Sequence, residues 1–390
     1  MSKFFASFSW SMSIILLVFV ILTLEELVDG RTILSAANKA IIKTIKVDEY
    51  EIIDCYDIYQ QPSLNHPLLY NHTIQMRPSM NPKNIKLDNF GMFQLTQTWH
   101  KYGTCPRGTV PIRRNIKHYN STLSRKHRRP KFSHSETPNT LQPNDVTENH
   151  EYAVIRVHGN FLGGQAKINL WNPVVEAPIE ISVSQIWVVA GQSDDFNSIE
   201  AEWEVCEPRY GDYQTRFFRT NINYCTNLEC EGFVHISSDI ALGCKFSEVS
   251  TFKGDQKDAT FRIHKVRNSG NWWVEIQGIS VGYYPSSLFT QLSKTTTKIE
   301  FGGEIYNDRS KGRHTIAQMG SGHFPSEGGL GISSYFHHVQ VIDGSNVAKD
   351  PEDVETYVSN PSCYNLEIDK KHTNGYGFFY GGQGYNDNCP

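Results

Sequence analysis

Two glutamate-rich segments carry the residues best suited to acid–base chemistry. Each is predicted to be a β-strand, in which alternate side chains share a face. The polar faces hold Glu200, Glu202 and Glu204 in FNSIEAEWEV, and Glu300, Gly302 and Glu304 in KIEFGGEIY. Side by side, two such strands would gather several carboxylates, and the glycines of the second segment would leave room for a substrate near the backbone.

Two carboxylates that face one water can hydrolyse a bond without a metal. The ionised one accepts a proton from water, and the protonated one donates to the leaving group. Because close like charges separate the two pKa values, such a pair works while it shares one proton, which predicts an acidic working range. A glycoside hydrolase could use the same pair, and solvated glutamates on amphipathic strands are common, so the pattern alone leaves three interpretations open.

Charge and motifs exclude several other classes. The chain has 37 Lys and Arg against 41 Asp and Glu, a net charge of −4, which argues against a uniformly basic nucleic-acid binder. HExxH, P-loop and GxGxxG motifs are absent, and the 15 His are scattered. We therefore expect no metal and no cofactor.

The N-terminus predicts a secreted protein. Residues 1–30 contain Lys3 and then the apolar run IILLVFVILTL, typical of a signal peptide and too short to span a membrane. Eight cysteines follow this segment, an even number that favours disulfides in an oxidising compartment. Asn71 and Asn120 lie in glycosylation sequons. We expect an extracellular, apoplastic or vacuolar protein without a membrane segment after signal removal.

The rest of the chain divides into three predicted parts. Residues 31–112 form an N-terminal region in which 36–46 has the pattern of a short amphipathic helix. Residues 113–150 form a linker that is first basic, including RKHRRP, and then rich in Pro, Ser, Thr and Asn. This linker is interpreted as a processing site, with a solvated spacer or a patch for acidic polysaccharide as alternatives.

Residues 151–390 predict an all-β domain. Nine short β-like runs alternate with turns, from AVIRVHG to YFHHVQVID, and only SSLFTQLSK after Pro285 looks helical. The expected fold is an antiparallel β-sandwich of two sheets with roughly seven strands each, preceded by a small α+β region.

Ordered motifs along most of residues 50–390 resemble the plant neprosin family. They include DCYDIYQQPSLNHPLLYNHTIQ, FNSIEAEWEVCEPRYGDYQTRFFRT, IEFGGEIY, QMGSGHFPSEG and the cysteine-containing tail. The resemblance implies a secreted glutamic endopeptidase with a β-sandwich fold, made as a zymogen with an N-terminal activation peptide, that cleaves after proline at acidic pH. Its catalytic glutamates map onto Glu200 and onto Glu304, with Glu300 on the same face as an alternative.

The resemblance also implies three disulfides, Cys55–Cys105, Cys225–Cys230 and Cys363–Cys389. Cys206 and Cys244 depart from the family pattern, and we predict that they form a fourth bridge, with unpaired thiols as the alternative. Glu202 is a further departure, since the family tends to carry a small residue there. An extra carboxylate beside Glu200 is expected to raise the pKa of its neighbour.

The expected partners are a proline-containing peptide or protein substrate and the chain's own propeptide, with the protein a monomer. The alternative function is a secreted wall-associated binding module without catalysis, whose aromatic residues stack on sugars. The aromatic candidates for that role are Trp171, Trp272, Trp273 and Tyr283.

Overall fold

The computed structural model describes residues 40–86, 96–114, 149–192, 195–221, 227–228, 231–308, 312–371 and 374–390. The predicted signal peptide, most of the linker with Asn120, and Cys225 and Cys230 lie outside these residues. Asn71 is exposed on a loop, as its sequon requires. Within the described part, no helix has the length and apolar character needed to cross a membrane.

The N-terminal domain, residues 40–114, is built on a three-stranded antiparallel sheet in the order β1-β2-β3. These strands are β1 (Ile41–Lys46), β2 (Ile52–Asp57) and β3 (Thr109–Arg113). The 3-10 helices η1 (Ile58–Gln60), η2 (Pro62–Asn65), η3 (Pro67–Leu69) and η4 (Thr98–Tyr102) make up its other described elements. The predicted disulfide Cys55–Cys105 is confirmed and closes this domain.

The helix predicted over residues 36–46 is wrong for its described part. Ile41–Lys46 is a strand that pairs with β2, and Ile45 enters a small core at 3% exposure. The β-branched residues Ile41, Ile42, Thr44 and Ile45 favour this extended state. Sheet pairing therefore overrides the helical spacing of the apolar residues.

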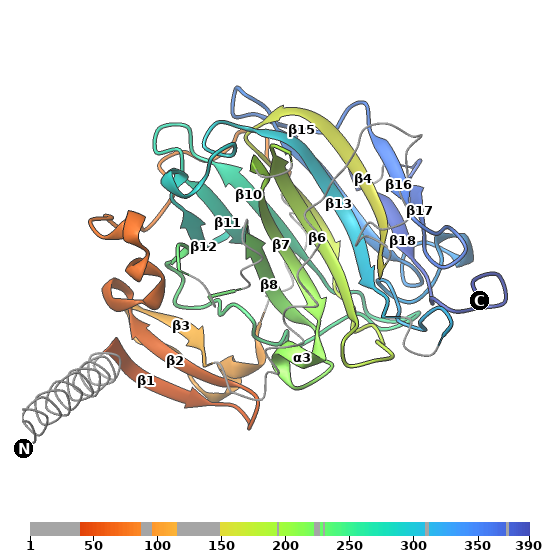
Figure 1. Cartoon of the computed structure of the whole chain (residues 1–390), viewed down its shortest axis with the longest axis horizontal. Helices are drawn as coiled ribbons and strands as arrows, with labels where there is room; N and C mark the ends of the chain where they lie inside the picture. The colour runs from red at the N-terminus through yellow and green to blue at the C-terminus, as the bar shows by residue number, and fades with distance from the viewer. Residues whose placement is uncertain are drawn as a thin grey trace, which may run out of the picture.

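The second domain is a sandwich of two antiparallel sheets, which confirms the predicted fold class. The six-stranded sheet has the order β16-β4-β13-β6-β7-β8, and the nine-stranded sheet has the order β17-β18-β14-β5-β10-β11-β12-β9, with β15 paired to β14. The strands are thus divided nine and six rather than about seven each. In Figure 1, β4, β13, β6, β7 and β8 run side by side across the centre of the molecule.

The bounds of the first sheet are β16 (Glu355–Val358), β4 (His150–Phe161), β13 (Thr296–Tyr306), β6 (Ile181–Ala190), β7 (Asn197–Val205) and β8 (Arg216–Asn221). Those of the second are β17 (Asn365–Ile368), β18 (Phe378–Gly381), β14 (Ser334–Ile342), β5 (Gly163–Asn169), β10 (Asp258–Lys265), β11 (Trp272–Ile276), β12 (Ile279–Tyr284), β9 (Val234–His235) and β15 (Ala348–Lys349). Short helices α3 (Glu207–Tyr210), η7 (Ser286–Leu288) and η8 (Pro325–Glu327) lie between strands. The helix predicted in SSLFTQLSK is therefore reduced to one 3-10 turn.

The main core lies between the two sheets and confirms the predicted alternation of β7. Ile199, Ala201, Trp203 and Val205 are fully buried there, together with Phe301 of β13 and residues of the opposite sheet. Because alternate side chains of a strand face opposite ways, the glutamates of β7 and β13 project from the other face of the six-stranded sheet. We call this the outer face.

The glycines of β13 serve packing. A side chain at Gly303 would lie 2.7 Å from Met319 and 2.8 Å from Tyr380, which occupy this space in the core. At Gly302, whose φ is +150°, a Cβ would meet the backbone of β4 at Ala153 and Val154. The expectation that these glycines leave room for a substrate is therefore wrong for Gly303.

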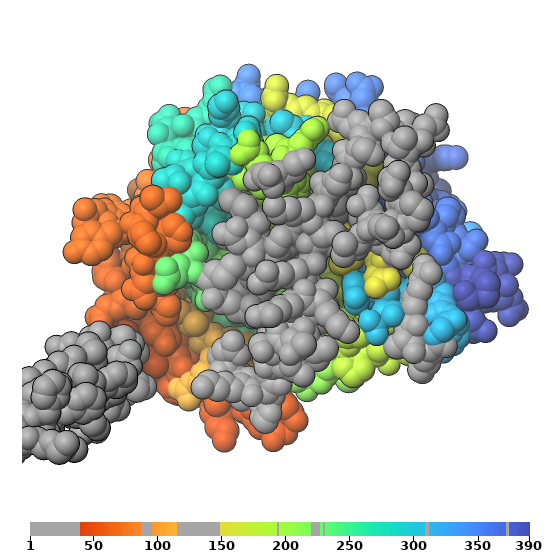
Figure 2. Space-filling model, in the orientation of Figure 1, coloured from red at the N-terminus to blue at the C-terminus, as the bar shows by residue number. Residues whose placement is uncertain are grey.

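The N-terminal domain docks at the β8 and β9 edges of the sandwich. Ile58, Leu69 and Val110 pack in one cluster with Trp273 and Tyr283. The Gln61 side chain both donates to the backbone carbonyl of His235 at 2.9 Å and accepts from its N–H at 2.9 Å. Figure 2 shows the N-terminal residues, in orange, as one flank of the molecule beside the sandwich.

Candidate active site

Strand register orders the side chains of the outer face into three rows. Cross-strand partners in an antiparallel pair project to the same face. From β4 through β13, β6 and β7, the rows are Arg156–Glu300–Trp187–Glu200, Val154–Gly302–Gln185–Glu202 and Tyr152–Glu304–Val183–Glu204. The structure thus brings all the glutamates predicted for the site to one face of one sheet.

Glu200 and Glu304 lie diagonally across β6, two strands and two rows apart. Gln185 and Glu202 occupy the row between them. Glu300, by contrast, shares a row with Glu200, with Trp187 between them. Sequence spacing predicted the shared face but not this order, because it does not tell which strands are neighbours.

These glutamates are buried, contrary to the solvated strand face considered from the sequence. Glu200 is 3% exposed, and Glu202 and Glu304 are 0% exposed. Buried carboxylates require partners, because transfer of an uncompensated charge out of water is costly. The identity of each partner is therefore informative about the state of each carboxylate.

Glu304 is held by an amide, a hydroxyl and an imidazole. Gln185 Nε2 donates to Oε2 at 2.8 Å, and the Tyr152 hydroxyl lies 3.4 Å from Oε1. His150 Nδ1 lies 2.6 Å from the same Oε1, with both side chains nearly inaccessible. Three groups able to donate to one carboxylate favour its ionised form.

Glu300 is instead held by cations. Arg156 Nε lies 2.6 Å from Oε1, and Lys298 Nζ lies 3.2 Å from the same oxygen. Arg156 also stacks over the ring of Tyr357 at 3.9 Å. Permanent positive charge on both sides stabilises the carboxylate as an anion and suits a structural ion pair.

The glutamates of β7 also differ in their contacts. Ser198 Oγ donates to Glu200 Oε1 at 3.0 Å. Glu204 Oε1 accepts from Arg209 Nη1 and from the Tyr210 hydroxyl, both at 2.7 Å. Burial, and secondarily the Glu204 charge, raise the pKa of Tyr210 well above its ordinary value. Glu204 is thus fixed by an Arg–Tyr pair, whereas a serine hydroxyl contacts Glu200.

The predicted Cys206–Cys244 disulfide is wrong, because neither residue forms a disulfide. Cys206 packs with Tyr210 and Phe218 beside the outer face, whereas Cys244 packs with Ile53 and Trp99 against the N-terminal domain. The two thiols thus belong to separate hydrophobic clusters, which is the physical reason that the predicted bridge does not form. The Cys363–Cys389 bridge is confirmed, and Cys225–Cys230 falls outside the described residues.

The aromatic residues considered for sugar stacking are buried. Trp171 and Trp272 belong to the main core. Trp273 and Tyr283 lie under the N-terminal domain, where Tyr283 accepts a hydrogen bond from the N–H of Gln75 at 2.9 Å. None of the four offers an open ring for a sugar in this form of the protein, so the sequence-based argument for a binding module loses its support.

Sequence reasoning missed His150 and Gln185. Gln185 is a polar residue within the apolar run ISVSQIWVVA, and strand alternation alone could have placed it on the face opposite Ile186. His150 lay in the predicted linker, at the boundary of the β domain. Its place opposite Tyr306 follows only from the pairing of β4 with β13.

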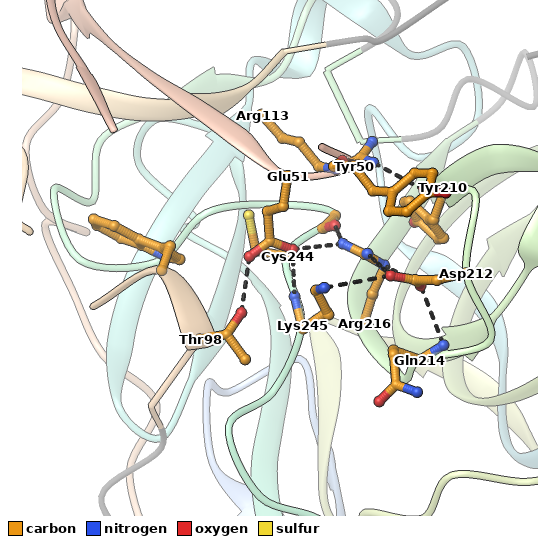
Figure 3. Close-up of polar contacts among 12 residues, drawn as sticks. Tyr50, Glu51, Thr98, Arg113, Tyr210, Asp212, Gln214, Arg216, Cys244 and Lys245 are labelled. Atoms are coloured by element: carbon orange, nitrogen blue, oxygen red, sulfur yellow. Dashed lines mark hydrogen bonds and ion pairs between the residues drawn. The ribbon is translucent and has the colours of Figure 1, made fainter. Parts of the chain in front are cut away.

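The interface with the N-terminal domain contains a second group of buried charges (Figure 3). Arg216 Nη1 lies 2.7 Å from Glu51 Oε2, and both side chains are 0% exposed. Asp212 Oδ2 lies 2.7 Å from Arg216 Nη2 and 3.4 Å from Lys245 Nζ. Thr98 Oγ1 donates to the other Glu51 oxygen at 2.8 Å. Residues from two segments of the N-terminal domain thus complete this cluster.

Fold and site together define an antiparallel β-sandwich protein that carries a docked N-terminal domain. A Neprosin family model matches residues 178–383, and a Neprosin activation peptide model matches residues 44–156. The chain belongs to the neprosin family, since the first match alone spans more than half of the chain. This confirms the resemblance found in the sequence.

Among solved structures, the chain is similar to Scytalido-glutamic peptidase with a transition state analog inhibitor, at 10% identity and a TM-score of 0.36. It is also similar to SCP-B, a member of the Eqolisin family of peptidases, in complex with the tripeptide Ala-Ile-His, at 9% identity and a TM-score of 0.33. Each match covers 60% of this chain and 98% of the other. At these scores the likenesses carry no inference about the chemistry of this chain.

Proposed function

We propose that this protein is the zymogen of a glutamic endopeptidase in which Glu200 and Glu304 activate water. One observation carries the proposal: within the neprosin domain, both carboxylates are buried on the same face of one sheet. The contacts of the neighbouring acids support the choice. Glu204 and Glu300 are held by arginine, whereas the partners described above for Glu200 and Glu304 are hydroxyl, amide and imidazole groups.

The partners of Glu304 fit it for the role of general base. Donation by Gln185, Tyr152 and His150 stabilises its ionised form, so it can take a proton from water as the water oxygen attacks the scissile carbonyl. Glu200, which has the fewer donors among the contacts described above, then starts protonated and transfers its proton to the leaving nitrogen. One proton is shared by two buried carboxylates, so activity is confined to acidic pH.

The remaining features of the proposal follow the family resemblance. The protein is secreted, acts as a monomer and prefers to cleave after proline. Processing falls in the linker, at RKHRRP or at Pro130, Pro138 or Pro143, and separates residues 31–112 from the catalytic domain. The contacts of Gln61 and Glu51 support the docking of this propeptide on the sandwich before processing.

The test is expression of residues 31–390, acidification, and mass spectrometry of the cleavage products of a proline-containing peptide. Glu304→Gln and Glu200→Gln should each lower kcat/KM by about 100-fold to 10,000-fold, the range for loss of an acid–base group. Glu300→Gln is the matched control on the same strand and should stay within about threefold of the wild type.

Two results would contradict the assignment. Activity that survives in Glu304→Gln and is lost in Glu300→Gln would move the second role to Glu300. A wild-type protein that is processed but does not cleave the peptide would contradict the proposed peptidase function. A crystal structure of the processed enzyme gives a further check, because carboxylates of Glu200 and Glu304 more than about 8 Å apart could not share one water.

A further inference from the structure

His150 lies at the boundary between the propeptide side of the chain and the catalytic sandwich. It is the last residue of the predicted linker and the first residue of β4. Its side chain is 3% exposed, and its Nδ1 lies 2.6 Å from Oε1 of the fully buried Glu304. A titratable group is therefore buried in direct contact with the proposed general base, and the mechanism above uses it only as one of three donors.

The sandwich itself holds His150 in this place. His150 pairs with Tyr306 of β13, and the N–H of Asn307 donates to the carbonyl of Asn149 at 2.7 Å. The edge of the Tyr306 ring packs against the imidazole at a centroid distance of 5.0 Å. These contacts come from β13 and would remain after the N-terminal domain is lost.

The next residue anchors the other face of the same strand. Glu151 Oε1 accepts from Asn307 Nδ2 at 3.0 Å and lies 2.7 Å from His314 Nε2. The start of β4 is thus fixed on both faces. The activation peptide match runs to residue 156, yet in the structure residues 150–156 are part of the sheet that carries Glu304.

Building on the proposed function, we propose that His150 is a positioning residue that holds the Glu304 carboxylate in place and in its ionised form, and that activation must leave it attached. A cut between Arg114 and Asn149 preserves the contact. A cut after His150 removes the imidazole from the active site. The processing region predicted from the sequence, residues 113–150, is thereby limited at its C-terminal end.

The charges around the pair favour this role. An imidazole N–H in contact with a carboxylate donates to it, and an imidazolium adds its charge; both favour the ionised form of the carboxylate. Tyr152 and Tyr306 face the pair and stay neutral in acid, and Gln185 is neutral. Arg156 is bound to Glu300. The acids of β7 act in the opposite direction, because like charge favours protonation of Glu304: Glu204 shares its row, and Glu202 and Glu200 lie one and two rows away.

A matched pair of variants separates charge from shape. In His150→Asn the amide nitrogen takes nearly the place of Nδ1, so it keeps a donor but loses the positive charge. His150→Phe keeps an aromatic ring but loses both the hydrogen-bond donor and the positive charge. Each variant is made in the full chain, activated by acid, and assayed for kcat/KM from pH 2.5 to 7, with N-terminal sequencing of the processed product.

In His150→Asn we expect the acid limb of the profile to move up by about one to two pH units, with the high-pH limb unchanged. Activity at the lowest pH should fall by about tenfold per unit of that movement. His150→Phe should show the same movement and a lower maximum. Two results would overturn the proposal. One is an active enzyme whose mature N-terminus lies beyond residue 150, and the other is a pH profile of His150→Asn in which the acid limb does not move.

A second measurement does not depend on activity. NMR of the acid-processed protein compares the imidazole N–H chemical shift of His150 in the wild type and in Glu304→Gln. A downfield N–H resonance is expected in the wild type, because Nδ1 lies 2.6 Å from a carboxylate oxygen, and this resonance should move upfield in Glu304→Gln, whose neutral amide makes a weaker hydrogen bond. Equal values would overturn the role of His150 even in an active enzyme. An inert wild type with the expected NMR shift would reject only the peptidase function.

Discussion

Two groups of buried acids in this protein differ in their partners. At the interface with the N-terminal domain, Glu51 and Asp212 both contact the guanidinium of Arg216 at 2.7 Å. On the outer face, Glu304 contacts Gln185, Tyr152 and His150. Glu51 and Glu304 are both 0% exposed, so burial alone does not distinguish a structural carboxylate from a chemical one.

The difference teaches what each group can do. A carboxylate paired with a buried guanidinium is fixed in its charged form, and removal of either partner leaves an uncompensated charge. A carboxylate held by an amide, a hydroxyl and an imidazole can exchange a proton at moderate cost, because these three partners carry no permanent charge. The first arrangement suits docking and the second suits catalysis.

The two groups come close at Tyr210. Its hydroxyl donates to Glu204 on the outer face, and its ring lies 4.6 Å from the Arg216 guanidinium carbon. Arg113 of the N-terminal domain lies over the same ring at 5.1 Å. The interface group thus borders the end of the glutamate face rather than standing apart from it.

The largest expected effect on stability comes from the interface. Arg216→Met should lower the free energy of unfolding of the full chain by about 3–5 kcal/mol, because it leaves the fully buried Glu51 without its cation and Asp212 with Lys245 alone. Denaturant unfolding followed by tryptophan fluorescence measures this.

Lys86→Met is the matched control for Arg216→Met. Lys86 also pairs with an acid, Asp350, at 2.6 Å, but the two side chains are 40% and 45% exposed, so its loss should cost no more than about 1 kcal/mol. Adding Glu51→Gln to Arg216→Met should recover part of the loss. If the two single substitutions lowered the free energy of unfolding equally, the argument that the buried ion pair contributes more than the exposed one would be wrong.

A smaller, pH-dependent effect is expected at His235, beneath the N-terminal domain. Burial lowers the pKa of His235 to about 4, from an ordinary 6.5. A histidine whose pKa is lowered by folding stays neutral in the folded state while the unfolded chain takes up a proton. Stability is therefore full above about pH 6.5 and falls by up to about 3 kcal/mol as the pH decreases to about 4.

His235→Asn should flatten this part of the stability profile. Its side chain loses the contact of Nε2 with the carbonyl of Ile240 at 2.8 Å, so its stability at pH 7 is expected to be lower than that of the wild type. The informative quantity is the slope between pH 6.5 and 4, measured from unfolding midpoints. A slope unchanged from the wild type would contradict the burial argument.

The smallest effect concerns the two thiols, one beside each group. Cys206→Ala and Cys244→Ala should each change stability by about 1 kcal/mol or less, because no disulfide is broken and the lost volume is small. A disulfide between them would cost about 2–5 kcal/mol on removal. Thiol titration of the unfolded chain gives a direct check, since the absence of reaction from Cys206 and Cys244 would mean that they are oxidised.

Much of this architecture follows from local sequence. The nine β-like runs became strands because alternation, β-branched residues and turn formers act over a few residues. The same reasoning put Glu200, Glu202 and Glu204 on one face of β7. It failed at Ile41–Lys46, where helical spacing competed with pairing to β2, and at SSLFTQLSK, which forms only the short η7.

By itself, the sequence determined the sandwich class, the family and the faces on which the glutamates lie. Tertiary structure decided which of them are neighbours, because strand order joins segments that are far apart along the chain. It placed His150 on Glu304, fixed Glu300 with Arg156, and separated Cys206 from Cys244. Those contacts decide which partners each buried group has. They could not be predicted from the sequence, because the periodicity along one strand carries no information about which strand lies beside it.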